Sequence, residues 1–272
     1  MQAMAAVLYE AGTPLRLEQV EVLPPQRGEV LVRIYAGGVC HSDLHVMKGH
    51  LPMPKPIILG HEGSGIVEEV GEGVTSVQQG DHVIFIWRVS CGSCDYCSSG
   101  RPALCDVGTQ VRVTGLMPNG TTRFRLNGEP IRHFAGVSSF SELSTMPEAA
   151  VLKIPQDFPL DKAALLGCGV ITGVGAVANV GNSVAIFGCG GIGLNAVQGA
   201  RIVGALKIIA VDVMPQKLEY ARQMGATHLV DGSKEDPVEV IRELTGGRGV
   251  DYAFEAIGLA KTIEQAYAAI RR

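Results

Sequence analysis

The sequence predicts an α/β protein with an all-β part, in which a β-barrel is followed by an incomplete, doubly wound parallel sheet. Two observations predict this fold. From Met1 to about residue 152, short stretches of alternating polarity are broken by Gly and Pro, which is typical of strands in a partly closed barrel. From residue 183 onward, short β-branched apolar runs alternate with helical patterns, which is typical of βαβ units. We therefore expect two domains, residues 1–165 and residues 166–272.

In the first half, clear strand patterns occupy residues 29–37, 63–74 and 81–87. Residues 153–161 have the composition of a connector, and a helical stretch begins near its end. The segment from residue 163 to 200 contains no Asp, Glu, Lys or Arg, but its glycines and amides argue against a single membrane-spanning helix. We expect it to form a buried helix followed by a buried parallel strand.

The composition excludes several classes of function. The 272-residue chain is 46% hydrophobic and 18% charged, values typical of a globular protein with a large core. Its net charge of −4 provides no basic field for a nucleic acid. The N-terminus has no basic region of the kind that begins a secretory signal. We expect neither a nucleic-acid nor a membrane partner, and a cytoplasmic location.

Four of the seven cysteines fall within one short segment, about residues 91–105. Thiolates at this spacing can surround a tetrahedral zinc ion at Zn–S distances of about 2.3 Å, and four of them leave no open position, so the site is expected to be structural. An iron–sulfur cluster is the alternative, but the ferredoxin pattern places its fourth cysteine closer and follows it with Pro rather than Asp106. Four unligated thiols are the other alternative. The four residues are Cys91, Cys94, Cys97 and Cys105.

The segment from residue 183 to 217 contains the order strand, glycine-rich turn, helix, strand and acid that is the fingerprint of a Rossmann dinucleotide site. Gly188 permits the tight turn, while Gly193 lets helix and strand pack closely. The following helix directs free N–H groups toward a pyrophosphate. Asp212 would accept hydrogen bonds from a ribose 2′-hydroxyl, which favours NAD over NADP. A glycine-rich packing turn is the alternative. The glycines are Gly188, Gly190, Gly191 and Gly193.

A second possible metal set is dispersed along the chain: Cys40, His61 and Cys168. Two thiolates and one imidazole leave a fourth position free for water or substrate, which is the form of a catalytic zinc. Each residue taken singly fits an ordinary core position equally well, because a lone cysteine usually packs as a small hydrophobic residue.

Four motifs, in this order along the chain, resemble those of the zinc-dependent medium-chain alcohol dehydrogenases. The resemblance covers essentially the whole sequence. It implies a GroES-like β-barrel catalytic domain joined to a Rossmann domain, with a catalytic zinc in the cleft between them. The motifs are Cys40-His41-Ser42-Asp43-Leu44-His45, then Gly60-His61-Glu62 with Gly65, Gly71 and Val74, then the four-cysteine lobe, and finally Gly167-Cys168-Gly169 with the GCGGIG turn.

The resemblance also implies roles for single residues. One catalytic zinc would be held by Cys40, His61 and Cys168. Glu62 would lie just behind this zinc, either supporting its ligands or acting as an alternate ligand, and the lobe would hold one structural zinc. Asp43 would orient the His61 ring, and the alcohol's proton would pass from Ser42 through the cofactor ribose to His45. NAD would be contacted by His41, Thr172, Asp212 and Lys217. Trp87 and Phe134 would line the substrate pocket, although both could equally be core aromatics.

The Rossmann pattern contains four of the usual six strands, so the resemblance implies a C-terminally truncated member. Residues 250–255 would form an exposed sheet edge, and we expect a self-association through this edge that differs from the family's usual dimer, or else poor stability.

The leading interpretation is a zinc- and NAD-dependent alcohol dehydrogenase acting on a small alcohol or aldehyde, with activity reduced or lost. The alternatives are a zinc-dependent hydrolase or esterase, which uses the exposed zinc, and a non-catalytic zinc-binding relic. The sequence argues against a zinc protease and a serine hydrolase, because neither the HExxH motif nor the G-x-S-x-G motif occurs.

Overall fold

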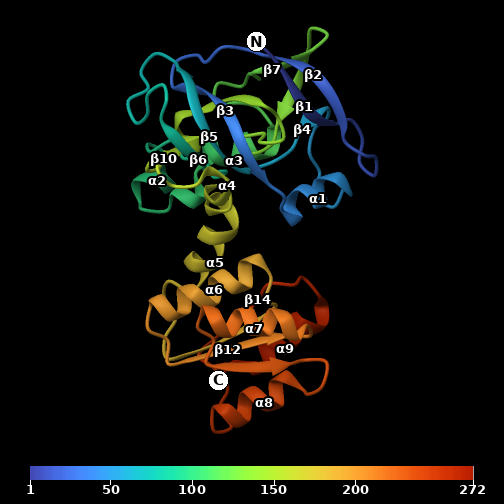
Figure 1. The fold of residues 1–272 in the computed structure, drawn as a ribbon, viewed down its shortest axis with the longest axis vertical. Helices are drawn as coiled ribbons and strands as arrows, with labels where there is room; N and C mark the ends of the chain where they lie inside the picture. Colours follow the sequence, from blue (N-terminus) through green and yellow to red (C-terminus); the bar gives the residue numbers. More distant parts are fainter. Residues whose placement is uncertain (272) are drawn as a thin grey trace. The chain divides into compact units, whose positions relative to one another are not determined.

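A computed structural model describes residues 1–271 (Figure 1). The chain forms two compact units, Met1–Cys168 and Gly169–Arg272, and each is described by itself. The division falls just after the predicted boundary at residue 165. In the described residues, no helix combines the length and the apolar character that crossing a membrane requires.

The first unit contains a closed barrel and a separate antiparallel sheet, so the predicted all-β half is confirmed. The barrel has the order β1 (Gln2–Leu8), β2 (Arg16–Val22), β7 (Phe124–Leu126), β8 (Glu129–His133) and β4 (Ile57–Ile58). The sheet has the order β10 (Val151–Lys153), β6 (His82–Phe85), β5 (Glu62–Val70), β3 (Glu29–Gly38) and β9 (Leu143–Pro147). Short helices lie in the connections: α1 (His41–Met47), α2 (Asp95–Ser98), η1 (Pro102–Leu104), α3 (Asp106–Thr114), η2 (Glu148–Ala150) and α4 (Leu160–Ala163).

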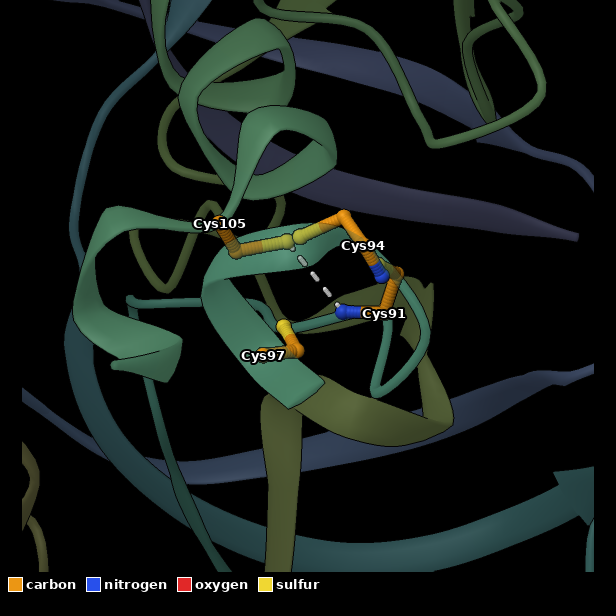
Figure 2. Close-up of side chains that lie close together, drawn as sticks. All are labelled: Cys91, Cys94, Cys97 and Cys105. Carbon is orange, nitrogen blue, oxygen red and sulfur yellow. Dashed lines mark hydrogen bonds between the residues drawn. The ribbon is translucent and has the colours of Figure 1, made fainter. Parts of the chain in front are cut away.

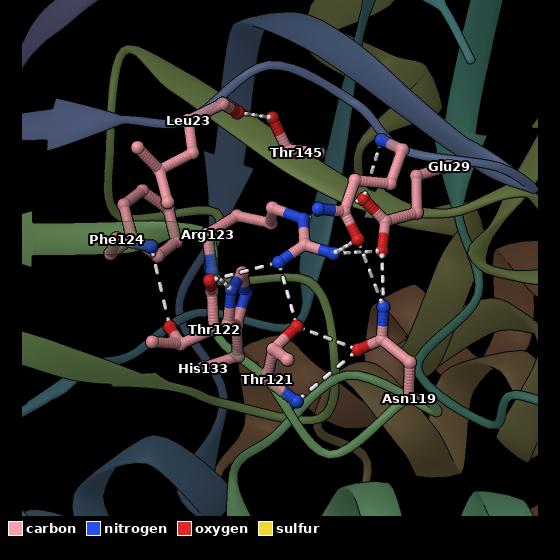
Figure 3. Close-up of polar contacts among 10 residues, drawn as sticks. Leu23, Glu29, Asn119, Thr121, Thr122, Arg123, Phe124, His133 and Thr145 are labelled. Atoms are coloured by element: carbon pink, nitrogen blue, oxygen red, sulfur yellow. Dashed lines mark hydrogen bonds and ion pairs between the residues drawn. The ribbon is translucent and has the colours of Figure 1, made fainter.

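A buried polar network joins the barrel to the sheet (Figure 3). Arg123, immediately before β7, pairs with Glu29 at the start of β3 at 2.6 Å, and both side chains are almost fully buried. The same guanidinium donates to the Gln26 side chain, and the Asn119 amide donates to Glu29. The backbone N–H of Arg123 donates to Nε2 of buried His133. A charge pair at this depth is tolerated only because its hydrogen bonds are satisfied from several sides.

The second unit is a four-stranded parallel sheet with helices on both faces, the expected incomplete doubly wound arrangement. The strand order is β13 (His228–Asp231), β12 (Lys207–Asp212), β11 (Ser183–Phe187) and β14 (Tyr252–Glu255), so β14 is an edge strand. Successive β11 side chains point to opposite faces: Val184 and Ile186 pack with α6 (Gly191–Ile202) and α7 (Pro215–Met224), while Ala185 and Phe187 pack with α8 (Pro237–Leu244) and α9 (Ala260–Ala269).

Two details differ from expectation. The buried helix predicted after residue 163 is wrong. Beyond α4 the chain forms two short pieces, a π-helix at Leu166–Val170 and α5 (Ile171–Ala176), and Leu165 and Ile171 are each 52% exposed. The large apolar residues Leu259, Ile263, Tyr267 and Ile270 recur at helical spacing, which predicts a helix with one apolar face. The helix forms as α9, but two of these residues do not face the core. Ile263 and Tyr267 are 52% and 82% exposed, whereas Ala266 and Ala269 are buried. Small residues let this helix approach the sheet, which leaves the larger apolar stripe outside.

Candidate active site and metal centres

The structure brings Cys40, His61, Glu62 and Cys168 together within the first unit. One ligating atom from each lies within 4.8 Å of the others. The four residues come from three separate segments: Cys40 precedes α1, His61 directly precedes β5 and Glu62 begins it, and Cys168 lies in the π-helix. Three of them are buried and Cys40 is half-buried. Single-turn π-helical segments are frequent at functional sites, and this one displays a candidate ligand.

Asp43 ties two of these segments to each other. Its buried carboxylate accepts from the backbone N–H of Cys40 at 3.1 Å and from that of Gly60 at 3.0 Å. The same carboxylate lies 3.4 Å from Nδ1 of His61. Because Nδ1 faces Asp43, Nε2 is left free for a metal ion, which is the usual carboxylate–histidine support.

Glycines allow the ligands to lie this close together. A β-carbon at Gly38 would meet the Glu62 carboxylate at 2.5 Å. A β-carbon at Gly167 would overlap the Phe85 carbonyl oxygen, so only glycine lets the π-helix pack against β6 next to Cys168.

The charges of this set favour a cation. Hydrogen bonds from Cys168 and His61 lower the pKa of Cys40 to about 3, and the proximity of Cys40 raises the pKa of Cys168 well above its ordinary value. Burial opposes protonation of His61, but Asp43 and Cys40 outweigh it and raise the pKa of His61 to about 9. Burial and the Cys40 thiolate raise the pKa of Glu62. Crowded acidic groups of this kind fit a divalent ion, which relieves their mutual repulsion.

Two aromatic rings stand edge-on to His61. The Phe134 ring lies 5.4 Å from the imidazole and the Trp87 ring 6.2 Å, measured between centroids. Both predicted pocket residues therefore lie next to the candidate centre. The Ser42 hydroxyl lies 3.7 Å from the Cys40 sulfur.

Two histidines of α1 with predicted roles are exposed. His45 has its Nδ1 3.3 Å from Nδ1 of His50, and its ring lies 5.5 Å from that of His41. No hydrogen bond between His45 and Ser42 is present among the described residues.

The four-cysteine lobe forms a second candidate centre, shown in Figure 2. Its four sulfur atoms lie within 4.8 Å of one another and come from one short segment. Backbone N–H groups point at the sulfurs: Cys91 and Gly108 donate to Cys105 at 3.3 and 3.4 Å, and Cys94 donates to Cys91 at 3.4 Å. The N–H groups of Ser93 and Cys94 lower the pKa of Cys91 to about 6.

Cys105 has a backbone environment of its own. It caps the N-terminus of α3, where the helix dipole stabilises negative charge. Loss of solvation and the neighbouring thiols raise the pKa of Cys97 to about 11. Four thiols with this support fit a tetrahedral zinc ion.

In the second unit, the glycine-rich turn fits a dinucleotide. Gly188 has φ +95°, and a β-carbon at Gly193 would overlap the Gly188 carbonyl oxygen, so both positions require glycine. A β-carbon at Gly190 or Gly191 would meet nothing within 4 Å. The backbone at the start of α6 is therefore open to an approaching phosphate.

The other predicted cofactor residues of this unit have different surroundings. Buried Asp212 accepts from the N–H groups of Cys189 at 2.8 Å and Met214 at 2.9 Å, so it also fastens the glycine turn to β12. Lys217 is half-buried on α7, and Thr172 is exposed on α5.

Sequence reasoning missed the loop that follows Phe134. The hydroxyl of Ser139 donates to the Glu62 carbonyl oxygen, and its N–H donates to the Gly60 carbonyl oxygen. The serine pair in the run FAGVSSF was the only local signal, because these partners are far apart in the sequence.

Comparison with known proteins agrees with this geometry. Residues 26–156 match the family described as alcohol dehydrogenase GroES-like domain, and residues 191–272 match the family described as zinc-binding dehydrogenase. An S-(hydroxymethyl)glutathione dehydrogenase of a Synechocystis species is 48% identical over 274 residues, which cover 98% of this chain and 74% of that protein. A protein of the same description from Photobacterium damsela is 45% identical over 280 residues, which cover 100% of this chain and 76% of that protein.

Solved structures agree as well. An alcohol dehydrogenase zinc-binding domain protein from Burkholderia ambifaria is 42% identical with a TM-score of 0.93, covering 99% of this chain and 74% of that one. A benzyl alcohol dehydrogenase from Acinetobacter calcoaceticus is 36% identical with a TM-score of 0.92, covering 100% of this chain and 75% of that one. With both candidate metal sets and the glycine turn assembled on this fold, the chain belongs to the zinc-dependent medium-chain alcohol dehydrogenase family.

Proposed function

We propose that this protein oxidises primary alcohols to aldehydes with NAD, at a zinc ion held by Cys40, His61 and Cys168. The observation that carries the proposal is the convergence of these residues with Glu62 in a buried, acidic set whose histidine is oriented by Asp43. The four cysteines of the lobe would hold a second zinc that supports only the structure.

Each group has a distinct task. Zinc, when bound, supplies a Lewis acid that lowers the pKa of an alcohol. NAD supplies the hydride acceptor. Cys40 and Cys168 would bind the zinc ion as thiolates, and Asp43 holds the His61 ring with Nε2 free. Ser42, next to the Cys40 sulfur, would accept the proton of the alcohol, and exposed His45 would release it to solvent. Because these two side chains share no hydrogen bond, a hydroxyl group between them would carry the proton across.

The lining of the site supports an aromatic alcohol. The Trp87 and Phe134 rings stand nearly perpendicular to the His61 ring, and aromatic substrates pack well against aromatic side chains. The names of the relatives offer two candidates: one acts on benzyl alcohol and the others on S-(hydroxymethyl)glutathione. The apolar rings favour benzyl alcohol over the charged glutathione adduct.

The test is NADH formation, followed by absorbance, with benzyl alcohol and with formaldehyde plus glutathione. We expect turnover of benzyl alcohol that a chelator abolishes and zinc restores. Chelator-sensitive cleavage of a chromogenic ester without NADH formation would support a hydrolase instead. Two bound zinc ions with neither activity would contradict catalysis by this chain.

Two further features complete the proposal. β14 pairs only with β11 among the described strands, and the backbone groups on its outer side support self-association through this edge. Sedimentation that shows a stable, monodisperse monomer would count against this association. A reducing, cytoplasmic location suits the thiolate ligands, because oxidation to disulfides would release the metal.

A further inference from the structure

The loop from Phe134 to Phe140, which we call the brace, runs beside residues 58–62. It donates hydrogen bonds to four carbonyl groups of that segment. The Ser138 hydroxyl donates to Ile58 at 2.9 Å, and the Phe140 N–H donates to Leu59 at 3.0 Å. The N–H of Ser139 donates to Gly60 at 3.0 Å, and its hydroxyl donates to Glu62 at 2.7 Å. The brace therefore holds the main chain that carries two of the candidate ligands.

Ser139 has a special place in this loop because its two hydrogen bonds bracket His61. The Ser139 N–H holds the carbonyl of Gly60, the residue before the histidine. The Ser139 hydroxyl holds the carbonyl of Glu62, the residue after it. The side chain of Ser139 is buried, and a β-carbon at Gly60, where φ is +88°, would overlap the Ser139 hydroxyl. The main chain on both sides of His61 is thus held by one residue that does not reach the metal position itself.

The backbone of the brace is strained. Ala135 and Ser138 both have positive φ, at 54° and 57°, although neither is glycine. Such conformations cost energy and persist only where the surroundings hold them, and they cluster at functional sites. Here the Ser138 hydroxyl accepts from the Phe134 N–H at 2.9 Å, and this bond fixes the residue whose ring lies edge-on to His61.

We propose that Ser139 is a positioning residue for the catalytic metal centre. By holding the carbonyls of Gly60 and Glu62, it keeps the His61 ring and the Glu62 carboxylate within reach of one ion together with Cys40 and Cys168. The inference rests on the proposed function of these four residues. We further infer that retention of the catalytic metal depends on the Ser139 hydroxyl, which comes from a loop distant in sequence from His61 and Glu62.

The experiment compares Ser139→Ala with Ser141→Ala in the full chain. Ser141 is a matched control because it is also a buried serine, and its hydroxyl donates to the Leu143 carbonyl at 2.8 Å, away from residues 58–62. Zinc release into a chromogenic chelator is followed for both variants. Loss of a group that orients metal ligands commonly weakens binding by about 10–100-fold. We expect Ser139→Ala to release one zinc about tenfold faster or more, while the zinc of the four-cysteine lobe leaves at the wild-type rate.

Two further readouts separate positioning from a general loss of stability. Cobalt substituted at the catalytic centre should show an altered visible spectrum in Ser139→Ala and an unchanged one in Ser141→Ala. Ser139→Thr keeps the hydroxyl, so it should release the catalytic zinc as slowly as the wild-type protein does. Equal release from both alanine variants, or equal acceleration at both zinc sites, would overturn the role of Ser139. A wild-type protein that binds only the lobe zinc would instead overturn the proposed function.

Discussion

The two candidate metal centres differ in how the chain builds them. The four-cysteine lobe takes all its ligands from residues 91–105, and backbone N–H groups of the same segment stabilise its sulfurs. The Cys40 centre collects its ligands from three distant segments and depends on Asp43, on Gly38 and on the brace to bring them together. The lobe has four thiolates and no open position, whereas the dispersed set of two thiolates and an imidazole leaves room for a substrate.

The two centres should therefore lose their metal through changes in different parts of the chain. A local site needs only its own loop, so its loss should affect structure more than chemistry. A dispersed site needs the whole unit, so it should respond to changes in residues that never touch the ion.

The largest expected effect comes from removing a ligand of each centre in turn. His61→Ala should release the catalytic zinc and lower the rate of NADH formation by about 10³-fold or more, because the Lewis acid contributes several kcal/mol to the reaction. Cys97→Ala should release the lobe zinc and lower the free energy of unfolding, yet keep the catalytic ion and most of the kcat. Metal content, kcat and urea unfolding are measured together on both variants. A loss of both ions from either variant would show that the two centres are not independent.

An intermediate effect is expected from Asp43→Asn, which keeps the shape of the side chain but removes its charge. The His61 ring loses its partner at 3.4 Å, and we expect the affinity for the catalytic zinc to fall by about 10–100-fold. Chelator competition measures this affinity, and the lobe serves as an internal control. An unchanged affinity would contradict the role of Asp43 in orienting the imidazole.

The smallest effect concerns acid stability, which must be separated from loss of metal. Burial, with a smaller contribution from Arg123, lowers the pKa of His133 from 6.5 to about 3 (Figure 3). Below pH 6.5 the unfolded chain binds a proton that the folded chain rejects until about pH 3. The free energy of unfolding should therefore fall with acid by up to about 1.4 kcal/mol per pH unit from this residue.

The variant His133→Gln lacks this titration. The stability advantage of the wild-type protein over the variant should shrink as the pH falls from 7 to 5, as measured by urea unfolding with metal content followed in parallel. If the free energies of unfolding of the wild-type protein and the variant change equally with pH, His133 is not held neutral in the folded barrel.

Local patterns in the sequence predicted much of the fold and the four-cysteine set, whereas the dispersed set of Cys40, His61 and Cys168 was predicted from the resemblance to the family. Features that depend on neighbouring residues can be recognised in the amino-acid sequence. They include the glycine turn, the cysteine spacing and the motifs around Cys40 and His61. The outward stripe of α9 was not predictable, because periodicity identifies an apolar face without saying which face meets the sheet. The brace was missed for a related reason: the bond from Ser139 to Glu62 joins residues 77 positions apart and leaves no periodic signal. Asp212 was expected to meet a ribose, and its bond to the Cys189 N–H appears only when the turn is folded.

We infer that Cys40, His61 and Cys168 share one ion, separate from that of the lobe. X-ray absorption at the zinc edge of the fully loaded protein measures the ligands of both ions. We expect two zinc ions per chain and an average of three sulfur ligands per zinc, since one centre offers four thiolates and the other two. A single zinc per chain, surrounded only by sulfur, would contradict it.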